Sequence, residues 1–342
     1  MSFAFGIGIG TQNNQGEWLE VYYQQPIMTP GKDLIDVVET ALDYKGGNQA
    51  IDVKAEQLTR FANALRQLGQ TDQAKLAEKA AESKRPVVVT VLATDDTASS
   101  TPEVYLKLHL ISHRLAKPHS VKLDGIFGLL PNLAWTNEGA VDLNELPERQ
   151  LQARIEGRTL EVKSVDKFPQ MTDYVVPAGV RIADTARVRL GAYVGEGTTV
   201  MHEGFINFNA GTEGPGMIEG RISAGVFVGK GSDLGGSSST MGTLSGGGNI
   251  VISLGENCLL GANAGTGIPL GDRCTIEAGL YITAGTKVEV LDQNGKVADT
   301  VKARDLAGQS DLLFRRNSVS GAVQCQTNKT AVALNEELHK HN

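Results

Sequence analysis

The second half of the chain places a mostly aliphatic residue at every sixth position between residues 176 and 288. A period of six matches neither the ~3.6 residues of a helical turn nor the alternation of a flat strand, but it is typical of a parallel β-helix built from hexapeptide repeats. Each hexapeptide of such a fold forms one short strand and a turn, and three hexapeptides form one triangular coil. The positions on this period are Val176, Ile182, Val188, Val194, Val200, Ile206, Ile222, Val228, Leu234, Ile252, Cys258, Ala264, Leu270, Ile276, Ile282 and Val288.

The period is interrupted twice. Between Ile206 and Ile222 the spacing exceeds two repeats by four residues, so we expect residues 211–216 to leave the coil or to form a bulge. Irregular segments of a repeat scaffold often form its binding face.

The second interruption keeps the period but loses its apolar residues. Thr240 and Gly246 occupy the two positions between Leu234 and Ile252, within a stretch rich in serine and glycine. We therefore expect an excursion from the coil near residues 236–250.

The whole chain is expected to be mainly β, in four parts. These are an N-terminal α/β domain (1–120), a connecting α/β segment (121–175), a left-handed parallel β-helix (176–290) and a short C-terminal β extension (291–342). The composition predicts strands at 3–11, 18–24 and 86–94, and helices at 30–42, 55–83 and 102–115. The pair Asn294 and Gly295 predicts a hairpin turn in the extension.

Charge and composition exclude several classes of function. The net charge is -7, from 32 basic and 39 acidic residues without a basic block, which argues against nucleic acid or an anionic membrane as a partner. No apolar run is long enough to span a bilayer, and the first residues lack the features of a signal peptide. The three cysteines, Cys258, Cys274 and Cys325, have no paired spacing and suit a reducing compartment. We expect a cytoplasmic protein.

Stability arguments add an expectation of self-association. The aliphatic side chains stacked along the coils contribute less than the ordering of so many backbone residues costs. Ladder hydrogen bonds, other packing and contacts between subunits must supply the remainder. Oligomerisation is therefore expected from the repeat region itself.

Histidine usage limits the chemistry that the coils can perform. His202 is the one histidine among the coils, so a three-histidine zinc site is excluded, no zinc is expected, and His202 is a weak candidate for a general base. Glu219 is better placed, beside the interruption of the period and two residues before Arg221. Its carboxylate can act as a base or nucleophile, or it can form an ion pair with Arg221. The pair Arg315 and Arg316 can equally be a phosphate clamp or a solvated strand face.

Four stretches closely resemble the tetrahydrodipicolinate N-succinyltransferase family in the form found in pseudomonads and actinobacteria. The resemblance is dense over residues 175–323 and weaker in the first 120 residues. The stretches are MHEGFINFNAGT (201–212), MIEGRISAGVFVGKGSDLGGSSSTMGTLSGGG (217–248), CLLGANAGTGIPLGDRCTIEAGLYITAGT (258–286) and LLFRRNSVSGAV (312–323).

The resemblance implies an acyltransferase of the succinylase route to diaminopimelate and lysine. Such an enzyme transfers the succinyl group of succinyl-CoA, its co-substrate, to the amine of L-2-amino-6-oxopimelate, the ring-opened form of tetrahydrodipicolinate, and releases CoA. The family is a homotrimer with active sites between neighbouring β-helices. Two alternatives remain open: another CoA-dependent N-acyltransferase that acts on a different amine, and a non-catalytic trimeric β-helix scaffold.

The resemblance also implies roles for individual residues. Glu219 matches the catalytic carboxylate, and Gly242 matches a glycine beside the reacting thioester. The residues that match contacts to CoA or its succinyl group are Arg221, Gly236, Ser239, Ala262, Glu277, Ala278, Gly285, Lys302, Arg315, Arg316, Asn317 and Ser318.

One departure from the family concerns a cation. Some members hold magnesium or a similar cation on the threefold axis, between an early aspartate and the glutamate that corresponds to Glu203. Here Ala186 stands at the early position and Asp184 lies two residues before it. Three Glu203 carboxylates can still hold a cation, be protonated or be bridged by water, so a non-catalytic metal remains open.

Overall fold

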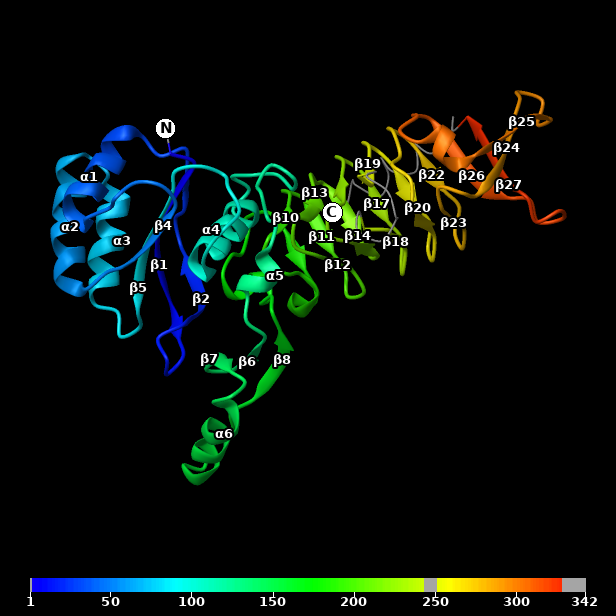
Figure 1. Ribbon diagram of the computed structural model, residues 1–342. Helices are drawn as coiled ribbons and strands as arrows, with labels where there is room; N and C mark the ends of the chain where they lie inside the picture. The colour runs from blue at the N-terminus through cyan, green and yellow to red at the C-terminus, as the bar shows by residue number, and fades with distance from the viewer. Residues whose placement is uncertain (1, 243–250, 328–342) are drawn as a thin grey trace. The chain divides into compact units, whose positions relative to one another are not determined.

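The computed structural model describes residues 2–242 and 251–327, which separate into two compact units (Figure 1). The first unit contains the residues up to Leu110 together with 120–169 and 173–175. The second contains 111–119, 170–172 and the chain from Val176 onward. The four-part division expected from the sequence remains a prediction.

The first unit is built on an antiparallel sheet with the strand order β2-β1-β5-β4, and the short β3 also pairs with β1. Phe5, Ile7 and Val89 of this sheet share a buried core with residues of three helices, Val38, Phe61 and Ala77 among them. The elements are β1 (Ala4–Gln12), β2 (Trp18–Tyr23), β3 (Ile27–Met28), α1 (Lys32–Leu42), β4 (Gln49–Asp52), α2 (Ala55–Gln67), α3 (Thr71–Ala81) and β5 (Val87–Leu92).

The expected strands and helices of this region are present, with two differences. The helix predicted over 55–83 is two helices, because Gly69 adopts a φ of 82° directly after Leu68, the C-cap of the first helix. Strands β3 and β4 were not predicted, because two and four residues are too few to show an alternating pattern.

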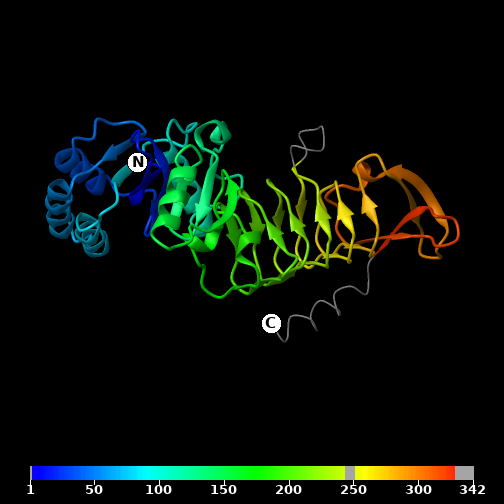
Figure 2. The same cartoon turned by 90° about the horizontal axis from the view of Figure 1, so that it is seen from below.

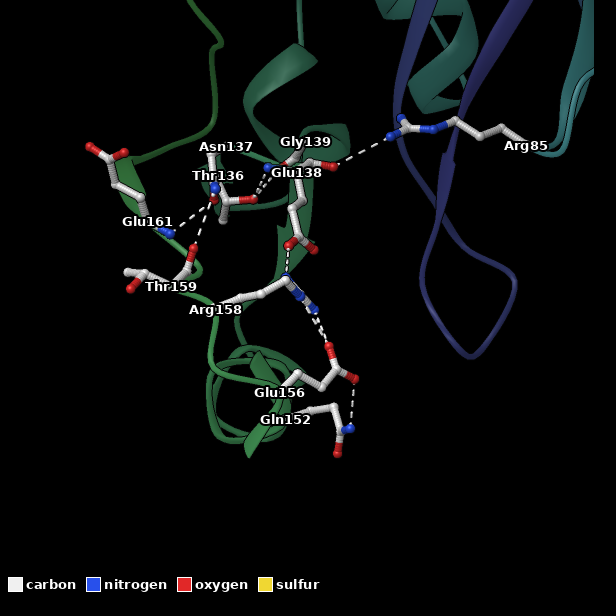
Figure 3. A network of polar contacts seen from close by, with 10 residues as sticks. All are labelled: Arg85, Thr136, Asn137, Glu138, Gly139, Gln152, Glu156, Arg158, Thr159 and Glu161. Atoms are coloured by element: carbon white, nitrogen blue, oxygen red, sulfur yellow. Dashed lines mark hydrogen bonds and ion pairs between the residues drawn. The ribbon is translucent and has the colours of Figure 1, made fainter. Parts of the chain in front are cut away.

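A small three-stranded sheet completes the first unit. It has the order β7-β6-β8 and is accompanied by helix α6. Figure 3 shows the polar side chains that hold this part together: Arg158 forms ion pairs with Glu138 and Glu156, and Arg85 reaches the Glu138 carbonyl at 3.4 Å. The remaining elements of this part of the chain are α4 (Thr101–Ser112), α5 (Ile126–Leu129), β6 (Leu133–Thr136), β7 (Gly139–Asp142), α6 (Leu146–Ile155), β8 (Val162–Asp166) and η1 (Met171–Asp173). The end of α4 and most of η1 belong to the second unit.

The second unit is a β-helix whose short strands stack in parallel on three faces (Figures 1 and 2). Its first face contains β9 (Arg181–Ile182), β11 (Thr198–Val200), β14 (Gly216–Ile218), β17 (Asp233–Leu234), β20 (Leu259–Leu260), β22 (Thr275–Ile276) and β26 (Leu312–Arg316). The second contains β12 (Phe205–Ile206), β15 (Arg221–Ile222), β18 (Ser239–Thr240), β21 (Gly265–Thr266) and β23 (Tyr281–Ile282). The third contains β10 (Ala192–Val194), β13 (Ala210–Thr212), β16 (Phe227–Val228) and β19 (Ser253–Leu254), and η2 (Thr185–Arg187) lies between β9 and β10.

The first irregularity of the coils differs from the expectation. Strands β13 and β14 both pair within the coils, so the predicted departure of residues 211–216 is wrong. The irregularity lies instead between Ile218 and Ile222, which are both fully buried only four residues apart. The sequence pattern missed this because Thr212 fills a buried strand position with a polar side chain.

The second irregularity follows Thr240, which is buried in β18. Residues 236–240 belong to the regular coil, whereas Gly246 and the centre of the predicted excursion lie outside the described residues. The coil resumes with Leu254 rather than Ile252, because Leu254 pairs with Val228.

Two further positions of the expected period are displaced in the same way. The strands end with Leu260 and Thr266, two residues after Cys258 and Ala264. Each of these pairs consists of two buried residues, so the earlier member imitates the repeat position. The period recovers at Leu270, only four residues after Thr266.

Both ends of the β-helix carry additional structure. At the start, Ser112 Oγ accepts a hydrogen bond from Gly191 N at 2.9 Å and donates one to Ala192 O at 3.1 Å, and Arg114 Nε donates to Val194 O at 2.7 Å. At the far end, β24 (Lys287–Leu291), β25 (Val297–Lys302) and β27 (Val323–Thr327) extend the first face, and η3 (Ala303–Leu306) follows β25.

The hairpin predicted at Asn294 and Gly295 is confirmed, since β24 and β25 pair antiparallel across it and Gly295 has a φ of 75°. Among the helices in residues 2–242 and 251–327, not one combines the length and the apolar character that crossing a bilayer requires.

Candidate active site

A group of the predicted site residues lies along one corner of the β-helix, where each strand of the first face turns toward the second face. The corners of successive coils are joined by backbone hydrogen bonds, from Ser237 N to Glu219 O (3.1 Å), from Asn263 N to Gly236 O (2.8 Å) and from Gly279 N to Ala262 O (2.8 Å). The three donor residues all have positive φ, between 55° and 74°. Glu219, Gly236, Ala262 and the pair Glu277 and Ala278 therefore form one column, which we call the corner column.

Glu219 lies at the start of this column, directly after β14. Its side chain is half-buried, and its backbone N–H donates to Leu234 O at 2.8 Å. A Cβ atom added to Gly236 would lie 3.5 Å from Glu219 Oε2, so the carboxylate extends over the glycine turn of the next coil. The absence of a side chain at Gly236 leaves room for a ligand beside the carboxylate.

Gly220 has a different function in the same corner. A Cβ atom there would lie 2.1 Å from Ser238 Oγ and 2.5 Å from Ser238 O. Only glycine lets these two coils approach so closely. Gly220 thus sets the distance between Glu219 and the coil that faces it.

Arg221 begins the strand that follows the corner. It is in register with Ser239 on the neighbouring strand, and its Nη2 donates to Ser239 Oγ at 2.6 Å. Ser239 is only 7% exposed, whereas Arg221 is exposed. Within residues 2–242 and 251–327, no ion pair joins Arg221 to Glu219. The sequence left two roles open for Glu219, a base or nucleophile and an ion pair with Arg221, and the second is not formed.

Arg316 is attached to the far end of the corner column. Its backbone N–H donates to Glu277 Oε2 at 2.8 Å, and its Nη1 donates to the Gly321 carbonyl at 2.9 Å. The turn that follows is organised by Asn317, whose Oδ1 accepts from Val319 N at 2.9 Å and from Ser320 N at 3.1 Å. Ser318 lies exposed in the same turn.

Three further predicted residues belong neither to the corner column nor to the segments described beside it. Gly285 follows β23, at the corner after the second face. Lys302 ends β25, is in register with Lys287, and its backbone N–H is capped by Asp305 Oδ2 at 3.1 Å. Gly242 follows β18 and is half-buried, and its neighbours from residue 243 lie outside the described residues.

Glu203 occupies the same corner one coil before Glu219. Its side chain is exposed and its carbonyl accepts from Arg187 Nη2 at 2.8 Å. Asp184 accepts a hydrogen bond from Ala186 N at 3.1 Å, and it serves as the N-cap of η2. Among the described residues of one chain, no three His, Cys, Asp or Glu side chains are grouped closely enough to hold a metal ion.

Among the cysteines, Cys325 offers no alternative nucleophile. All three are free and buried in the coils or their extension. Burial raises the pKa of the Cys325 thiol to about 12, which keeps it protonated at neutral pH.

Sequence reasoning missed residues whose function is to hold others. Gln324 is 6% exposed and bridges Arg315 and Glu289, through bonds of 3.4 Å and 3.0 Å. The alternation of polar and apolar residues in VQCQT could have indicated that Gln324 shares a face with the arginine strand, but the partner strand could not be known without the fold.

Comparisons with known proteins place this chain in a class. Residues 251–284 match the family model described as the hexapeptide repeat of succinyl-transferase. Together with the stacked parallel coils, this match makes the chain a hexapeptide-repeat acyltransferase. Residues 56–128 and 130–170 match the models for the N-terminal and middle parts of tetrahydrodipicolinate N-succinyltransferase.

Individual relatives agree along nearly the whole chain. Proteins named 2,3,4,5-tetrahydropyridine-2,6-dicarboxylate N-succinyltransferase from Pseudomonas putida and Vibrio cholerae are 68% and 62% identical over 340 residues, which is 99% of this chain and 98% and 99% of theirs. A crystal structure of a Campylobacter jejuni protein described as a 2,3,4,5-tetrahydropyridine-2-carboxylate N-succinyltransferase superposes with a TM-score of 0.87 at 31% identity, and covers 97% of this chain and 93% of that one. The chain belongs to the tetrahydrodipicolinate N-succinyltransferase family.

Proposed function

We propose that the chain transfers the succinyl group of succinyl-CoA to the amine of L-2-amino-6-oxopimelate, the ring-opened form of tetrahydrodipicolinate, and releases CoA. This reaction belongs to the succinylase route to diaminopimelate and lysine. The observation that carries the proposal is the corner column, in which the Glu219 carboxylate extends over the open turn at Gly236 in a chain of this family. Arg221, Arg315 and Arg316, which lie beside the column, suit a donor and an acceptor that are both anionic.

The chemistry requires a group that accepts a proton. An amine with a pKa near its ordinary value of about 8 is largely protonated at neutral pH, and nucleophilic attack needs its free electron pair. In the simplest sequence, the amine nitrogen attacks the thioester carbonyl, Glu219 takes the proton, and the carbon–sulfur bond breaks to release CoA. In the alternative sequence, a Glu219 oxygen attacks first, CoA leaves, and the amine then opens the resulting mixed anhydride.

Gly242 is proposed to lie beside the thioester during this step. It follows β18, the strand that also carries Ser239. A backbone N–H in a glycine-rich turn can stabilise the oxyanion of the tetrahedral intermediate, and glycine allows the thioester to approach closely.

The donor is proposed to bind along the corner column. Arg221, held by Ser239, begins the strand that follows the corner of Glu219, and Arg315 and Arg316 stand at the other end of the column. The residues of the column with little or no side chain, Gly236, Ala262 and Ala278, offer backbone groups and space to an extended pantetheine arm. Gly285, Lys302, Asn317 and Ser318 remain proposed CoA contacts.

The assembly is proposed to be a homotrimer of left-handed coils, with each site completed by a neighbouring chain. The exposed position of Arg221 supports this, because a substrate-binding arginine there needs a second wall to exclude water. Reaction in the cytoplasm fits the three unpaired cysteines.

A cation is not assigned a role. One exposed Glu203 per chain is a weak set of ligands, and Asp184 is occupied by the cap of η2. The residues present therefore do not fit the metal site of some family members, and no step of the reaction is routed through a metal.

Release of CoA under steady-state conditions tests the proposed function. We expect turnover with succinyl-CoA and either the cyclic imine or 2-aminopimelate, and much lower turnover with acetyl-CoA. Turnover that occurs only with acetyl-CoA as the donor, or only with a different amine as the acceptor, would support a different N-acyltransferase. A chain that binds no succinyl-CoA in calorimetry would be a scaffold.

A further inference from the structure

A row of three polar side chains crosses the sheet at the far end of the β-helix. Glu289 on β24 is in register with Gln324 on β27, and Gln324 is in register with Arg315 on β26. The outer two residues are half-buried, and Gln324 between them is 6% exposed. A neutral amide thus stands between a carboxylate and a guanidinium.

The hydrogen bonds of this row fix the orientation of the amide. Gln324 Nε2 donates to Glu289 Oε2 at 3.0 Å, and Gln324 Oε1 accepts from Arg315 Nη2 at 3.4 Å. An ionised carboxylate can only accept and a guanidinium can only donate, so the reverse orientation would leave both contacts unmade. Gln324 therefore stands between the two charges, whose strands are separated by two strand spacings of about 4.8 Å each.

The guanidinium of the neighbouring Arg316 is also kept out of an ion pair, through different contacts. Glu277 accepts the backbone N–H of Arg316, while the Arg316 guanidinium donates to the Gly321 carbonyl. The Glu277 carboxylate thus contacts the backbone of Arg316. The Glu289 carboxylate contacts Gln324, which is the hydrogen-bond partner of Arg315. Yet over the described ranges 2–242 and 251–327 neither guanidinium forms an ion pair within 4.0 Å.

We infer that Gln324 is a positioning residue that preserves the charge of Arg315 for the phosphate groups of the acyl-CoA donor. A carboxylate in direct contact with Arg315 would occupy the donors that a phosphate needs, because both ligands bind guanidinium in the same bidentate manner. The amide holds the arginine with a single long hydrogen bond and leaves its charge uncompensated. This inference rests on the proposed function, in which Arg315 contacts CoA.

An exchange of two side chains tests the inference without a change in net charge or atom count of the row. The double variant Glu289→Gln with Gln324→Glu moves the carboxylate onto the strand next to Arg315. We expect the KM for succinyl-CoA to rise roughly 10-fold or more while kcat stays within about twofold, as for a contact made equally in ground and transition states. Glu289→Gln alone should lower this KM slightly, because it removes the competing charge.

A second donor separates the positioning effect from a structural one. Succinyl-pantetheine lacks the nucleotide phosphates, so its KM should change by less than about twofold in the exchange variant. Equal increases for both donors, or no increase for succinyl-CoA, would overturn the inference. Gln324→Met, which keeps the volume and removes the amide, monitors packing through its melting temperature.

The inference about Gln324 can still be tested if the proposed function is wrong. Wild-type protein that turns over no acyl donor would overturn the proposed function. The exchange variant can then be compared with the wild type by calorimetry with CoA itself, where a dissociation constant raised roughly 10-fold still supports the inference and an unchanged one refutes it. If the exchange variant does not fold, Gln324→Glu alone must raise the same constant.

Discussion

Arg221 and Ser239 occupy paired positions on neighbouring strands, and the arginine donates a 2.6 Å hydrogen bond to the serine hydroxyl. The serine is buried and the arginine exposed, so the buried partner fixes the direction of the exposed one. A side chain with many rotamers is thereby held in one of them before a substrate arrives. Less entropy is lost on binding as a result.

Replacement of this serine should weaken substrate binding rather than folding. Because one hydrogen bond to a charged group contributes about 1.5 to 3 kcal/mol, Ser239→Ala is expected to raise the KM for a substrate roughly 10-fold. Steady-state kinetics on both substrates would identify which of them Arg221 holds. In an Arg221→Met background the serine replacement should have no further effect, and an independent effect would show that Ser239 acts without the arginine.

Glu219→Gln is expected to lower kcat by roughly 100-fold or more, the range that general acid–base catalysis commonly contributes. The amide is of equal size, and the corner is formed by backbone hydrogen bonds, so folding and CoA binding should be retained. Near-normal turnover would remove Glu219 from the mechanism. In the wild type, rapid mixing with succinyl-CoA alone should release a burst of CoA only if Glu219 becomes acylated.

Two glycines that are close in space should respond differently to alanine. Gly220→Ala places a Cβ 2.1 Å from Ser238 Oγ, so it should lower the melting temperature substantially. Gly236→Ala meets its nearest atom, Glu219 Oε2, at 3.5 Å and should leave the melting temperature nearly unchanged while it reduces activity. Equal melting temperatures for both variants would contradict the close approach of the two coils.

The pH dependence of stability should show the contribution of Glu20 in the first unit. This side chain is 5% exposed, and burial raises its pKa above the ordinary value of 4.5, although Thr11 and Tyr174 donate hydrogen bonds to it. Because the folded protein holds the proton more tightly than the unfolded chain, stability falls as pH rises from about 4.5 through the folded pKa.

Glu20→Gln removes this dependence. The melting temperature of the variant relative to the wild type should therefore increase from pH 4 to pH 7. Thermal scans in a series of buffers measure the trend, and a constant difference would mean that Glu20 does not titrate in this range.

Sedimentation equilibrium should give a mass of about 109 kDa, three chains of 36.3 kDa. The expectation follows from sites that need a second chain to cover Arg221. A monomer that retains full activity would show that one chain contains the complete site.

The β-helix could be predicted from the sequence because its buried residues recur at a spacing of six along the chain. Val188, Val194, Val200 and Ile206 are buried where the period places them. The register was lost at Cys258 and Ala264, because the residue two places before each strand end is also buried and small. A single apolar pattern cannot distinguish two buried positions of one repeat.

The candidate site was less accessible to sequence reasoning. Residues as distant as Glu219 and Ala278 are brought to one column because each coil repeats its corner, and this follows from the period alone. The relation between Arg315 and Glu289 does not, because it depends on β27 inserting between β24 and β26. Order along the chain gives no sign of that insertion.

The structures at the two ends of the β-helix determine how this protein can vary in length and how it avoids polymerising. A stack of parallel strands with a bare end would add strands from other molecules and grow into a filament. Here Ser112 and Arg114 occupy backbone groups of the first coil, and at the far end the antiparallel hairpin of β24 and β25 ends the first face. Duplication or loss of a coil can therefore be accommodated within the stack, where every coil meets a similar neighbour, but not at either end.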